Sequence, residues 1–309
     1  MGKARRVIFD RNFIFTLSFV LGLLVPGGLR YTMPLLLPSL GLVIVVSTLS
    51  IGTEIFRSPR VFLTGSFAGV GVNYLLMSGV ILALGALLIS DPQLRIGFIL
   101  VAAVPCAVAV VPFSDILDGD TVLSLFGMIG SYLSAFLLLP LITMLFIGSD
   151  LLDPKKLALI LAELIMIPLL ISRIARAVRL DAAIDPYKGP ITNVLLGVAF
   201  YVMVAANRDV ILHQTSVLLL VTIVGVTISA ISGGLVWGAS LLLSFRRDTR
   251  VSLLLMATLK NYALSAGIGL ILFSERTALP SVVMTIIMIP YILALDLLTA
   301  RHKKNEAPH

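Results

Sequence analysis

The sequence has little of what soluble enzymes and secreted domains depend on. Only 13% of its 309 residues are charged, and it contains one cysteine, Cys106. A single cysteine excludes an internal disulfide framework and a cysteine-rich metal site. The three histidines, His213, His302 and His309, fall in expected loops or in the tail, which argues against a buried histidine relay. No metal-protease, serine–histidine or paired-aspartate pattern occurs at helical spacing, so we expect neither an enzyme nor a cofactor.

Long polar segments are also lacking, and apolar residues are abundant instead. Hydrophobic residues make up 59% of the chain, and the mean hydropathy is +1.08. This composition predicts a polytopic protein of the lipid bilayer, since about 20 apolar residues suffice for one helix to cross it. By length and apolarity, we expect ten spans at residues 13–29, 34–51, 61–88, 97–117, 121–147, 157–174, 191–206, 216–244, 251–273 and 280–298. The basic start lacks a small-residue cleavage site, so we expect a retained first helix.

The positive charges are unevenly divided between the two sets of expected loops. If both ends face the cytoplasm, sixteen of the 23 lysines and arginines lie on the cytoplasmic side and six on the other. Cytoplasmic loops of membrane proteins carry such an excess. We therefore expect an inner-membrane protein with both termini in the cytoplasm. The net charge of +7 thus reflects topology, and no solvated basic face indicates nucleic-acid binding.

The expected spans follow the same order in two halves of the chain, residues 1–150 and 151–309. Each half has two helices, a long helix, a broken helix and a long helix with a late proline, Pro140 or Pro290. Because five is odd, the second copy is inverted relative to the first. The sequence therefore predicts an all-α fold of ten helices in a 5+5 inverted repeat. Secondary transporters share this pattern, with the binding site where paired broken helices meet.

Different signals indicate the two broken spans. In the first half, Pro105 and Pro112 each remove a backbone donor and disfavour straight helix before them. In the second half, Lys260 and Asn261 divide an apolar run into two pieces that are each too short to cross the bilayer. Unwound backbone at that depth is tolerated where it lines a cavity. The alternative is one continuous helix in which the Lys260 side chain extends to an interface.

The intramembrane charges are the first candidates for a site. Lys260 is the only lysine or arginine that we cannot assign to a helix end or a loop, so Lys260 and Asn261 are the central candidates. An ionisable residue at bilayer depth usually faces a partner or a cavity. Glu163 either faces the crossing of the broken helices or lies near the outer interface, where it needs no partner. Gly65 and Gly69 form a close-packing motif on the third span.

The order of ten spans, together with PCAVAVVPFSDILDGDTVLSL at residues 105–125 and LKNYALSAG at residues 259–267, resembles the bile acid:sodium symporter family. That family lies in a larger superfamily with arsenite permeases and auxin-type carriers. The resemblance implies a panel domain, from the first two helices of each half, and a core domain, from the last three. It also implies that the broken helices cross in the core, with Asn73 of the third span beside the crossing.

The residues that the resemblance would assign to sodium binding depart from the family's pattern. Val110 and Val111 stand where the family has a serine and an asparagine, and Met256 stands where it has an acidic ligand. Sodium prefers several hard oxygen ligands, as other hard cations do. Lys260 stands where the family has a glutamine, so we expect its ammonium to occupy the volume of a lost cation. It is either a permanent structural ion or a group that binds and releases a proton in each cycle.

Small polar residues near the expected crossing are weaker candidates for substrate or ion binding. These are Asn73, Ser114, Ser131 and Ser265. Asn73 can instead serve as a helix-packing hydrogen bond. Cys106 follows a proline as in arsenite permeases, where a thiolate would suit a soft metalloid. Its other role is that of a small buried hydrophobic residue.

From these features we expect a secondary transporter that moves a small organic anion across the inner membrane by alternating access. The anion follows from the buried cation at the crossing. The coupling ion is a proton, with sodium on backbone carbonyls as the alternative, or transport is independent of cations. Two other functions remain open, which are metalloid efflux through Cys106 and a membrane sensor that does not transport. The sequence indicates no oligomeric state.

Overall fold

The chain is mostly helical in the part that its structure, a computed structural model, describes: residues 10–49, 58–148 and 154–305. No β-strand occurs among these residues, so the predicted all-α class is confirmed. By length and composition, the helices that could cross a membrane are Pro26–Leu49, Pro59–Leu88, Thr121–Ile147, Lys155–Ala177, Leu180–Ala206 and Thr215–Leu242. Shorter apolar helices are Phe13–Leu24, Pro92–Ala103 and Tyr262–Leu272. The chain is a multi-pass membrane protein, and the count of ten spans stays a prediction.

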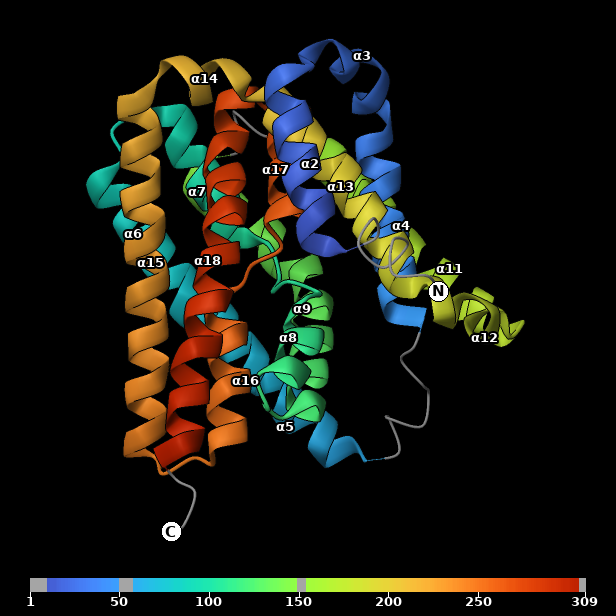
Figure 1. Ribbon diagram of the computed structural model, residues 1–309, viewed down its shortest axis with the longest axis vertical. Helices are drawn as coiled ribbons and strands as arrows, with labels where there is room; N and C mark the ends of the chain where they lie inside the picture. Colours follow the sequence, from blue (N-terminus) through green and yellow to red (C-terminus); the bar gives the residue numbers. More distant parts are fainter. Residues whose placement is uncertain (1–9, 50–57, 149–153, 306–309) are drawn as a thin grey trace.

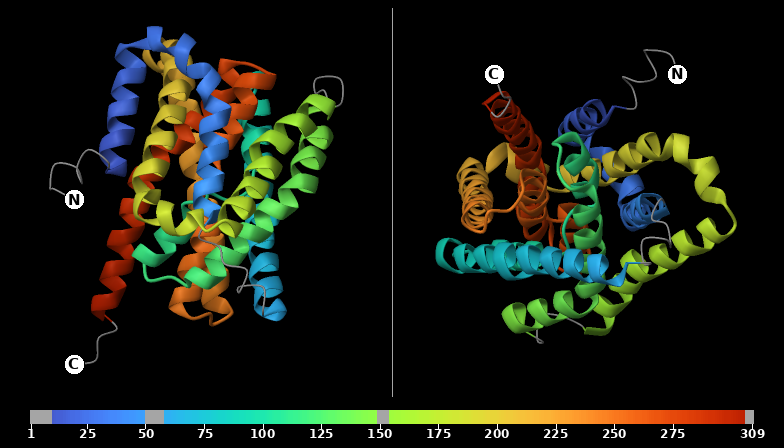
Figure 2. Two further views of the ribbon diagram at one scale, coloured as in Figure 1. Left: turned by 90° about the vertical axis from the view of Figure 1, so that its right-hand side faces the viewer. Right: turned by 90° about the horizontal axis from the view of Figure 1, so that it is seen from below.

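Four helices form a group on one side of the molecule, to the right in Figure 1. Helix α13 (Lys188–Ala206) packs against α2 (Arg11–Leu24) and α4 (Leu36–Leu49), and α4 also packs against α11 (Ile167–Ala177). Both views of Figure 2 show α2 and α4, in blue, beside α13 in yellow. The smaller elements attached to this group are α3 (Leu29–Thr32), α10 (Pro154–Leu161), η5 (Ala162–Met166) and α12 (Leu180–Ile184), and α14 (Arg208–His213) connects α13 to α15.

The remaining helices pack against one another in a second group. They are α5 (Pro59–Val70), η4 (Gly71–Met77), α6 (Ser78–Leu88), α7 (Pro92–Ala103), α8 (Val110–Ile116), α9 (Thr121–Ile147), α15 (Thr215–Leu242), α16 (Arg247–Thr258), α17 (Tyr262–Leu272) and α18 (Glu275–Asn305). Elements α5, η4 and α6 form one continuous helix. Its middle part, η4, is a π-helical stretch, a feature often found at functional sites.

Two helices of this second group are interrupted where the sequence predicts. Val104 takes an extended conformation at φ −76° and ψ 155°, which is the region favoured before a proline such as Pro105. In the second half, Leu259 is extended at φ −116° and ψ 108°, and helix resumes at Tyr262. The Asn261 side chain caps the new helix, because its Oδ1 accepts the Leu264 amide at 3.1 Å. The continuous helix considered as an alternative is therefore not found.

The close-packing motif of the third span brings α5 directly onto α9. A Cβ built on Gly65 would lie 2.7 Å from the Cβ of Phe126. A Cβ built on Gly69 would lie 2.3 Å from the Cα of Gly127, on the facing helix. Only a hydrogen fits at such a distance, so glycine is required at both positions of α5. This contact holds the α5–η4–α6 helix against α9, which in turn packs against α7, α8 and α16.

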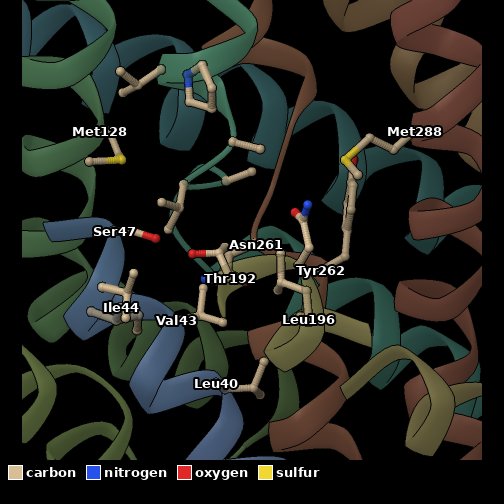
Figure 3. Close-up of a pocket in the computed structure, with 18 of the residues that line it drawn as sticks. Leu40, Val43, Ile44, Ser47, Met128, Thr192, Leu196, Asn261, Tyr262 and Met288 are labelled. Carbon is tan, nitrogen blue, oxygen red and sulfur yellow. The ribbon is translucent and has the colours of Figure 1, made fainter. Parts of the chain in front are cut away.

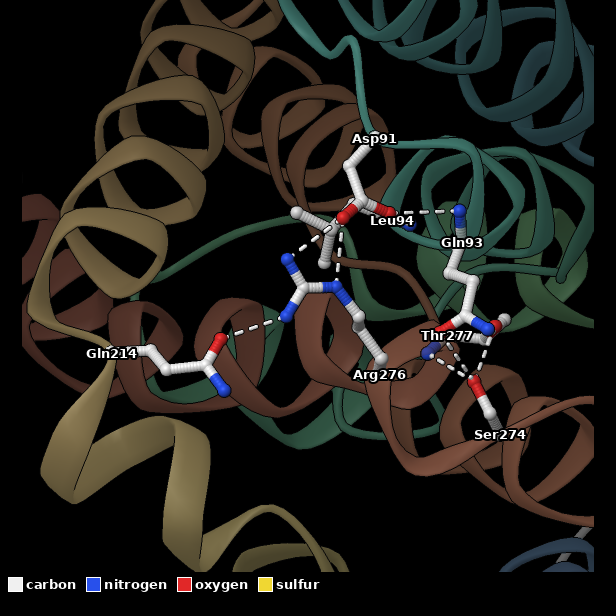
Figure 4. Close-up of polar contacts among 7 residues, drawn as sticks. All are labelled: Asp91, Gln93, Leu94, Gln214, Ser274, Arg276 and Thr277. Atoms are coloured by element: carbon white, nitrogen blue, oxygen red, sulfur yellow. Dashed lines mark hydrogen bonds and ion pairs between the residues drawn. The ribbon is translucent and has the colours of Figure 1, made fainter.

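A polar cluster joins the ends of three helices away from the interruptions (Figure 4). The Asp91 carboxylate accepts the backbone amides of Gln93 at 2.9 Å and Leu94 at 3.1 Å, and so caps α7. Arg276 of α18 donates to this carboxylate at 2.8 Å and 2.7 Å, and to Gln214, next to α15, at 2.8 Å. Burial raises the pKa of the Asp91 carboxyl, but the hydrogen bonds from Arg276 and the two amides outweigh it. The net pKa is lowered from its usual value.

Candidate functional site

The two helix interruptions are hydrogen-bonded to each other through their backbones. The Ala107 amide donates to the Leu259 carbonyl at 2.9 Å, and the Asn261 amide donates to the Pro105 carbonyl at 2.8 Å. Cys106 and Lys260 face each other as an antiparallel bridge between these bonds. An interruption within the membrane would otherwise leave buried backbone groups without partners, which costs several kcal/mol each. The unwound segments thus supply each other's missing hydrogen bonds.

Lys260 extends from this bridge into a shell of oxygen atoms and is only 1% exposed. Its Nζ donates to Asn73 Oδ1, Ser78 Oγ and the carbonyl oxygens of Ala102 and Val104, each at 2.9 Å. These oxygens come from the α5–η4–α6 helix and from the end of α7. The side chain therefore does not reach an interface, as the continuous-helix alternative required.

Asn261, next to Lys260 in the chain, turns to the opposite side and lines a cavity. Its Nδ2 donates to the Tyr132 hydroxyl at 2.7 Å, which connects α17 with α9. Also on α9, the Ser131 hydroxyl donates to the Met128 carbonyl at 2.8 Å and lies 3.1 Å from the Sγ of Cys106, which belongs to the crossing. Both Ser131 and Cys106 are completely buried.

The other predicted site residues lie farther from Lys260 or have other partners. Ser114 Oγ is 2.9 Å from Ser252 Oγ, where the end of α8 meets the start of α16. Ser265 accepts a hydrogen bond of 2.8 Å from Ser281, between α17 and α18. Glu163 is exposed in η5 and is not among the cavity-lining residues. The structure thus brings Asn73 to Lys260 and keeps Ser114, Ser265 and Glu163 apart from it.

A cavity of about 1030 Å³ lies between the two groups of helices and ends at the interruptions. Figure 3 shows Leu40, Val43 and Ile44 of α4 on one side and Tyr262 and Met288 on the other. The charged residues that line the cavity are Asp10, Asp115 and Lys188, which lie near helix ends, and Lys260 at the crossing. The cavity is therefore largely apolar, with charges at its mouth and polar groups near the crossing.

Two cavity-lining hydroxyls were missed by the sequence analysis. Ser47 of α4 and Thr192 of α13 line the same cavity as Asn261. Within the described part of the chain, neither hydroxyl makes a hydrogen bond, although other helical hydroxyls, such as that of Thr48, bond to a carbonyl one turn back. Both residues lie on apolar helices far apart in the sequence, and nothing in the sequence distinguishes them from serines and threonines that pack between helices.

Two helices, α17 and α8, follow the interruptions, and both begin at the cavity. Helix α17 starts at Tyr262, and Tyr262, Ala263 and Leu264 of its first turn line the cavity. The shorter α8 starts at Val110, and the preceding Val108 and Ala109 also line it. The N-terminus of a helix carries a partial positive charge. The inner end of the cavity is therefore electrically suited to a negative group.

The residues present do not fit a sodium ion at the positions that the resemblance indicates. Val110, Val111 and Met256 carry no side-chain oxygen. Lys260 places its own positive charge among the nearby oxygen atoms. A second cation beside the ammonium would be repelled, since like charges at close range cost several kcal/mol in a buried site.

The fold and the site together define a class: a multi-pass membrane protein in which interrupted helices close the end of a cavity is built for transport. A sequence model of the Sodium Bile acid symporter family matches residues 30–214. The match covers more than half of the chain, and the chain belongs to this family of transporters. The matched residues include the first interruption and end before the second. A comparison with curated proteins found no match.

Proposed function

We propose that this protein is a secondary carrier that moves a small organic anion across the inner membrane by alternating access. The observation that carries the proposal is the cavity, which leads from charged helix ends to the crossing of the two interruptions. A cavity of about 1030 Å³ is at the upper end of the usual range for small-molecule sites. It therefore has room for a substrate with a multi-ring apolar body.

The chemistry of the cavity supports an amphipathic anion. The apolar wall suits a hydrocarbon body, and the start of α17 with the Ser47 and Thr192 hydroxyls suits a carboxylate or sulfonate group. Lys260 lines the inner end of the cavity and favours an anion there by its charge, although its Nζ is hydrogen-bonded to Asn73, Ser78 and the end of α7. The Cys106 thiol faces Ser131 and is not a cavity-lining residue, so the structure does not favour the metalloid alternative.

We place this site in a 5+5 inverted repeat of ten spans, residues 1–150 and 151–309. The group of α2, α4, α11 and α13 corresponds to the panel domain, and the second group to the core domain. With both termini in the cytoplasm, Asp115 and Lys188 lie at the cytoplasmic ends of their helices, and the cavity opens to that side. Movement of the core against the panel would then expose the same site to the other side.

The driving force is not a sodium gradient in this proposal. Val110, Val111 and Met256 supply no ligand, so transport is coupled to a proton or is independent of cations. A proton would have to be carried by a group other than a permanently charged Lys260.

The experiment is uptake of labelled carboxylates and sulfonates with apolar bodies into proteoliposomes. Thr192→Trp places a bulky side chain in the cavity, and Leu137→Trp places the same side chain on the outer surface of α9, where Leu137 is 71% exposed. We expect uptake by the wild type and by Leu137→Trp, and its loss in Thr192→Trp. No uptake of any anion by the wild type, or equal uptake by both variants, would contradict the carrier proposal.

The coupling is tested in the same vesicles. We expect the initial rate to be unchanged when choline replaces sodium on both sides. Uptake that requires sodium would leave the carrier in place and refute the sodium-independent mechanism.

A further inference from the structure

The oxygen shell around Lys260 consists of acceptors alone. The carbonyls of Ala102 and Val104 have no hydrogen to donate. The Ser78 hydroxyl directs its own hydrogen to a carbonyl, since it lies 2.6 Å from the Ala102 oxygen and 3.0 Å from that of Asn73. Asn73 donates through Nδ2 to the Met256 carbonyl at 3.3 Å, which leaves Oδ1 for Lys260.

An acceptor-only shell requires an ammonium rather than an amine. A neutral amine would direct its lone pair at one of these oxygens, whereas an ammonium has three hydrogens and no lone pair. The four distances of 2.9 Å lie within the range of charge-assisted N–H···O bonds. The contacts of Nζ thus indicate that Lys260 is positively charged in the buried site.

The charge is balanced without a carboxylate. Among the described residues, no aspartate or glutamate forms an ion pair with Lys260. The titratable side chains near the ammonium are Tyr74, whose ring centroid is 4.6 Å from Nζ, and Cys106, which faces Lys260 across the bridge. The ring face attracts a cation, and so does the C-terminal end of α7, which supplies the Ala102 and Val104 carbonyls.

We propose that Asn73, Ser78 and the end of α7 form a monovalent-cation site which the chain fills permanently with its own Lys260 ammonium. The ammonium joins the α5–η4–α6 helix to the interrupted helix α7 and to the bridge between the interruptions. It therefore takes the structural role of a bound cation, but it cannot dissociate because it is covalently attached to the chain. The consequence for transport, that Lys260 is neither a sodium site nor a proton carrier, rests on the proposed function; the site itself does not.

The shell can be tested by truncating the Lys260 side chain and adding the removed fragment as a free cation. Lys260→Ala removes a fragment that equals n-propylammonium, while the shell stays in place. We expect the Tm of purified Lys260→Ala in detergent to lie below that of the wild type and to rise with propylammonium until the site is saturated. 1-Propanol, which has the same shape without the charge, should give no rise. Sodium should be less effective, because hard metal ions need oxygens at about 2.0–2.6 Å.

Three proteins serve as controls in this measurement. Lys260→Met places an uncharged side chain in the space of the Lys260 side chain, so its Tm should not change with any added cation. Lys188→Ala removes a lysine at the cavity mouth and should not respond either, like the wild type. A Lys260→Ala protein that is as stable as the wild type overturns the proposal, and so does an equal rise with 1-propanol or in Lys260→Met. Since no substrate is involved, a failed carrier proposal would leave this result unaffected.

A measurement on the wild type covers the case in which the variants do not fold. Protein labelled with ¹⁵N at the lysine Nζ should show one buried lysine with an ammonium chemical shift at neutral and at alkaline pH. It should be protected from exchange with solvent, because Lys260 is 1% exposed. An amine shift for this buried signal would overturn the proposal.

Discussion

Gly69→Ala is expected to separate two helices that support the site. The added Cβ would lie 2.3 Å from the Cα of Gly127 and 2.5 Å from its carbonyl oxygen, both backbone atoms. Carbon atoms in contact lie about 3.5–4.0 Å apart, so α5 and α9 would have to move apart by roughly 1 Å. Overpacking of this kind costs about 1–3 kcal/mol. Gly127→Ala should destabilise the protein less than Gly69→Ala, because the atom nearest to its added Cβ belongs to the flexible Met256 side chain.

The control lies on the same continuous helix. A Cβ on Gly79 would meet nothing within 4 Å, so Gly79→Ala changes only the backbone preference, which favours alanine in a helix by about 1 kcal/mol. Thermal unfolding in detergent, followed by circular dichroism, should give a Tm for Gly69→Ala several degrees below that of Gly79→Ala. Equal Tm values would refute the close contact between α5 and α9.

Three further predictions concern the polar contacts. The pKa of Asp91 is lower in the folded protein, so its contact with Arg276 stabilises the fold fully above the unfolded pKa, and this stabilisation is lost as pH falls through the folded pKa. The Tm difference between wild type and Asp91→Asn should therefore be constant above about pH 4 and shrink below it. Asn261→Ala should lower the free energy of unfolding by about 1–2 kcal/mol, through a lost helix cap and a lost hydrogen bond, whereas Asn261→Ser, which can still cap, should lose less by the same thermal assay. Ser47→Ala combined with Thr192→Val should raise the KM for the transported anion about tenfold, because two hydrogen bonds to the substrate of about 0.5–1.5 kcal/mol each are lost. The Tm should be unchanged, because these hydroxyls make no hydrogen bond within the described part of the protein. An unchanged KM would exclude these hydroxyls from the site.

The interruptions could be read from the sequence because each has a strong local cause. Pro105 has no amide hydrogen and forces Val104 out of helical geometry. Lys260 and Asn261 bring polar groups into an apolar run, and Asn261 is a good helix cap. Such causes act within a few residues, so neither break depends on knowledge of the rest of the fold. The start of the second span was close: α4 begins at Leu36, against the expected residue 34, but the short helical pieces of residues 26–35 that precede it were not expected.

The partners of Lys260 could not be read in the same way. Two of its four acceptors are the backbone carbonyls of Ala102 and Val104, which every residue possesses and which carry no sequence signal. Ser78 is one of many serines in apolar helices, and only the rotation of its helix directs it inward. For the same reason, the sequence could not decide which way Glu163 faces, and the structure leaves it exposed. As site residues, the predicted set stays a prediction that the transport assays will test.

The bridge between the interruptions has a consequence for how such a chain can change over generations. The bonds from Ala107 to Leu259 and from Asn261 to Pro105 join main-chain atoms only. An insertion or deletion in either segment would leave backbone groups of the other segment without hydrogen-bond partners, so the two breaks have to be inherited together. The side chains at Cys106 and Lys260, in contrast, take no part in these bonds. A change of side chain at the crossing therefore leaves the bridge itself intact, whereas a change at Lys260 also leaves its oxygen shell to be filled by another cation.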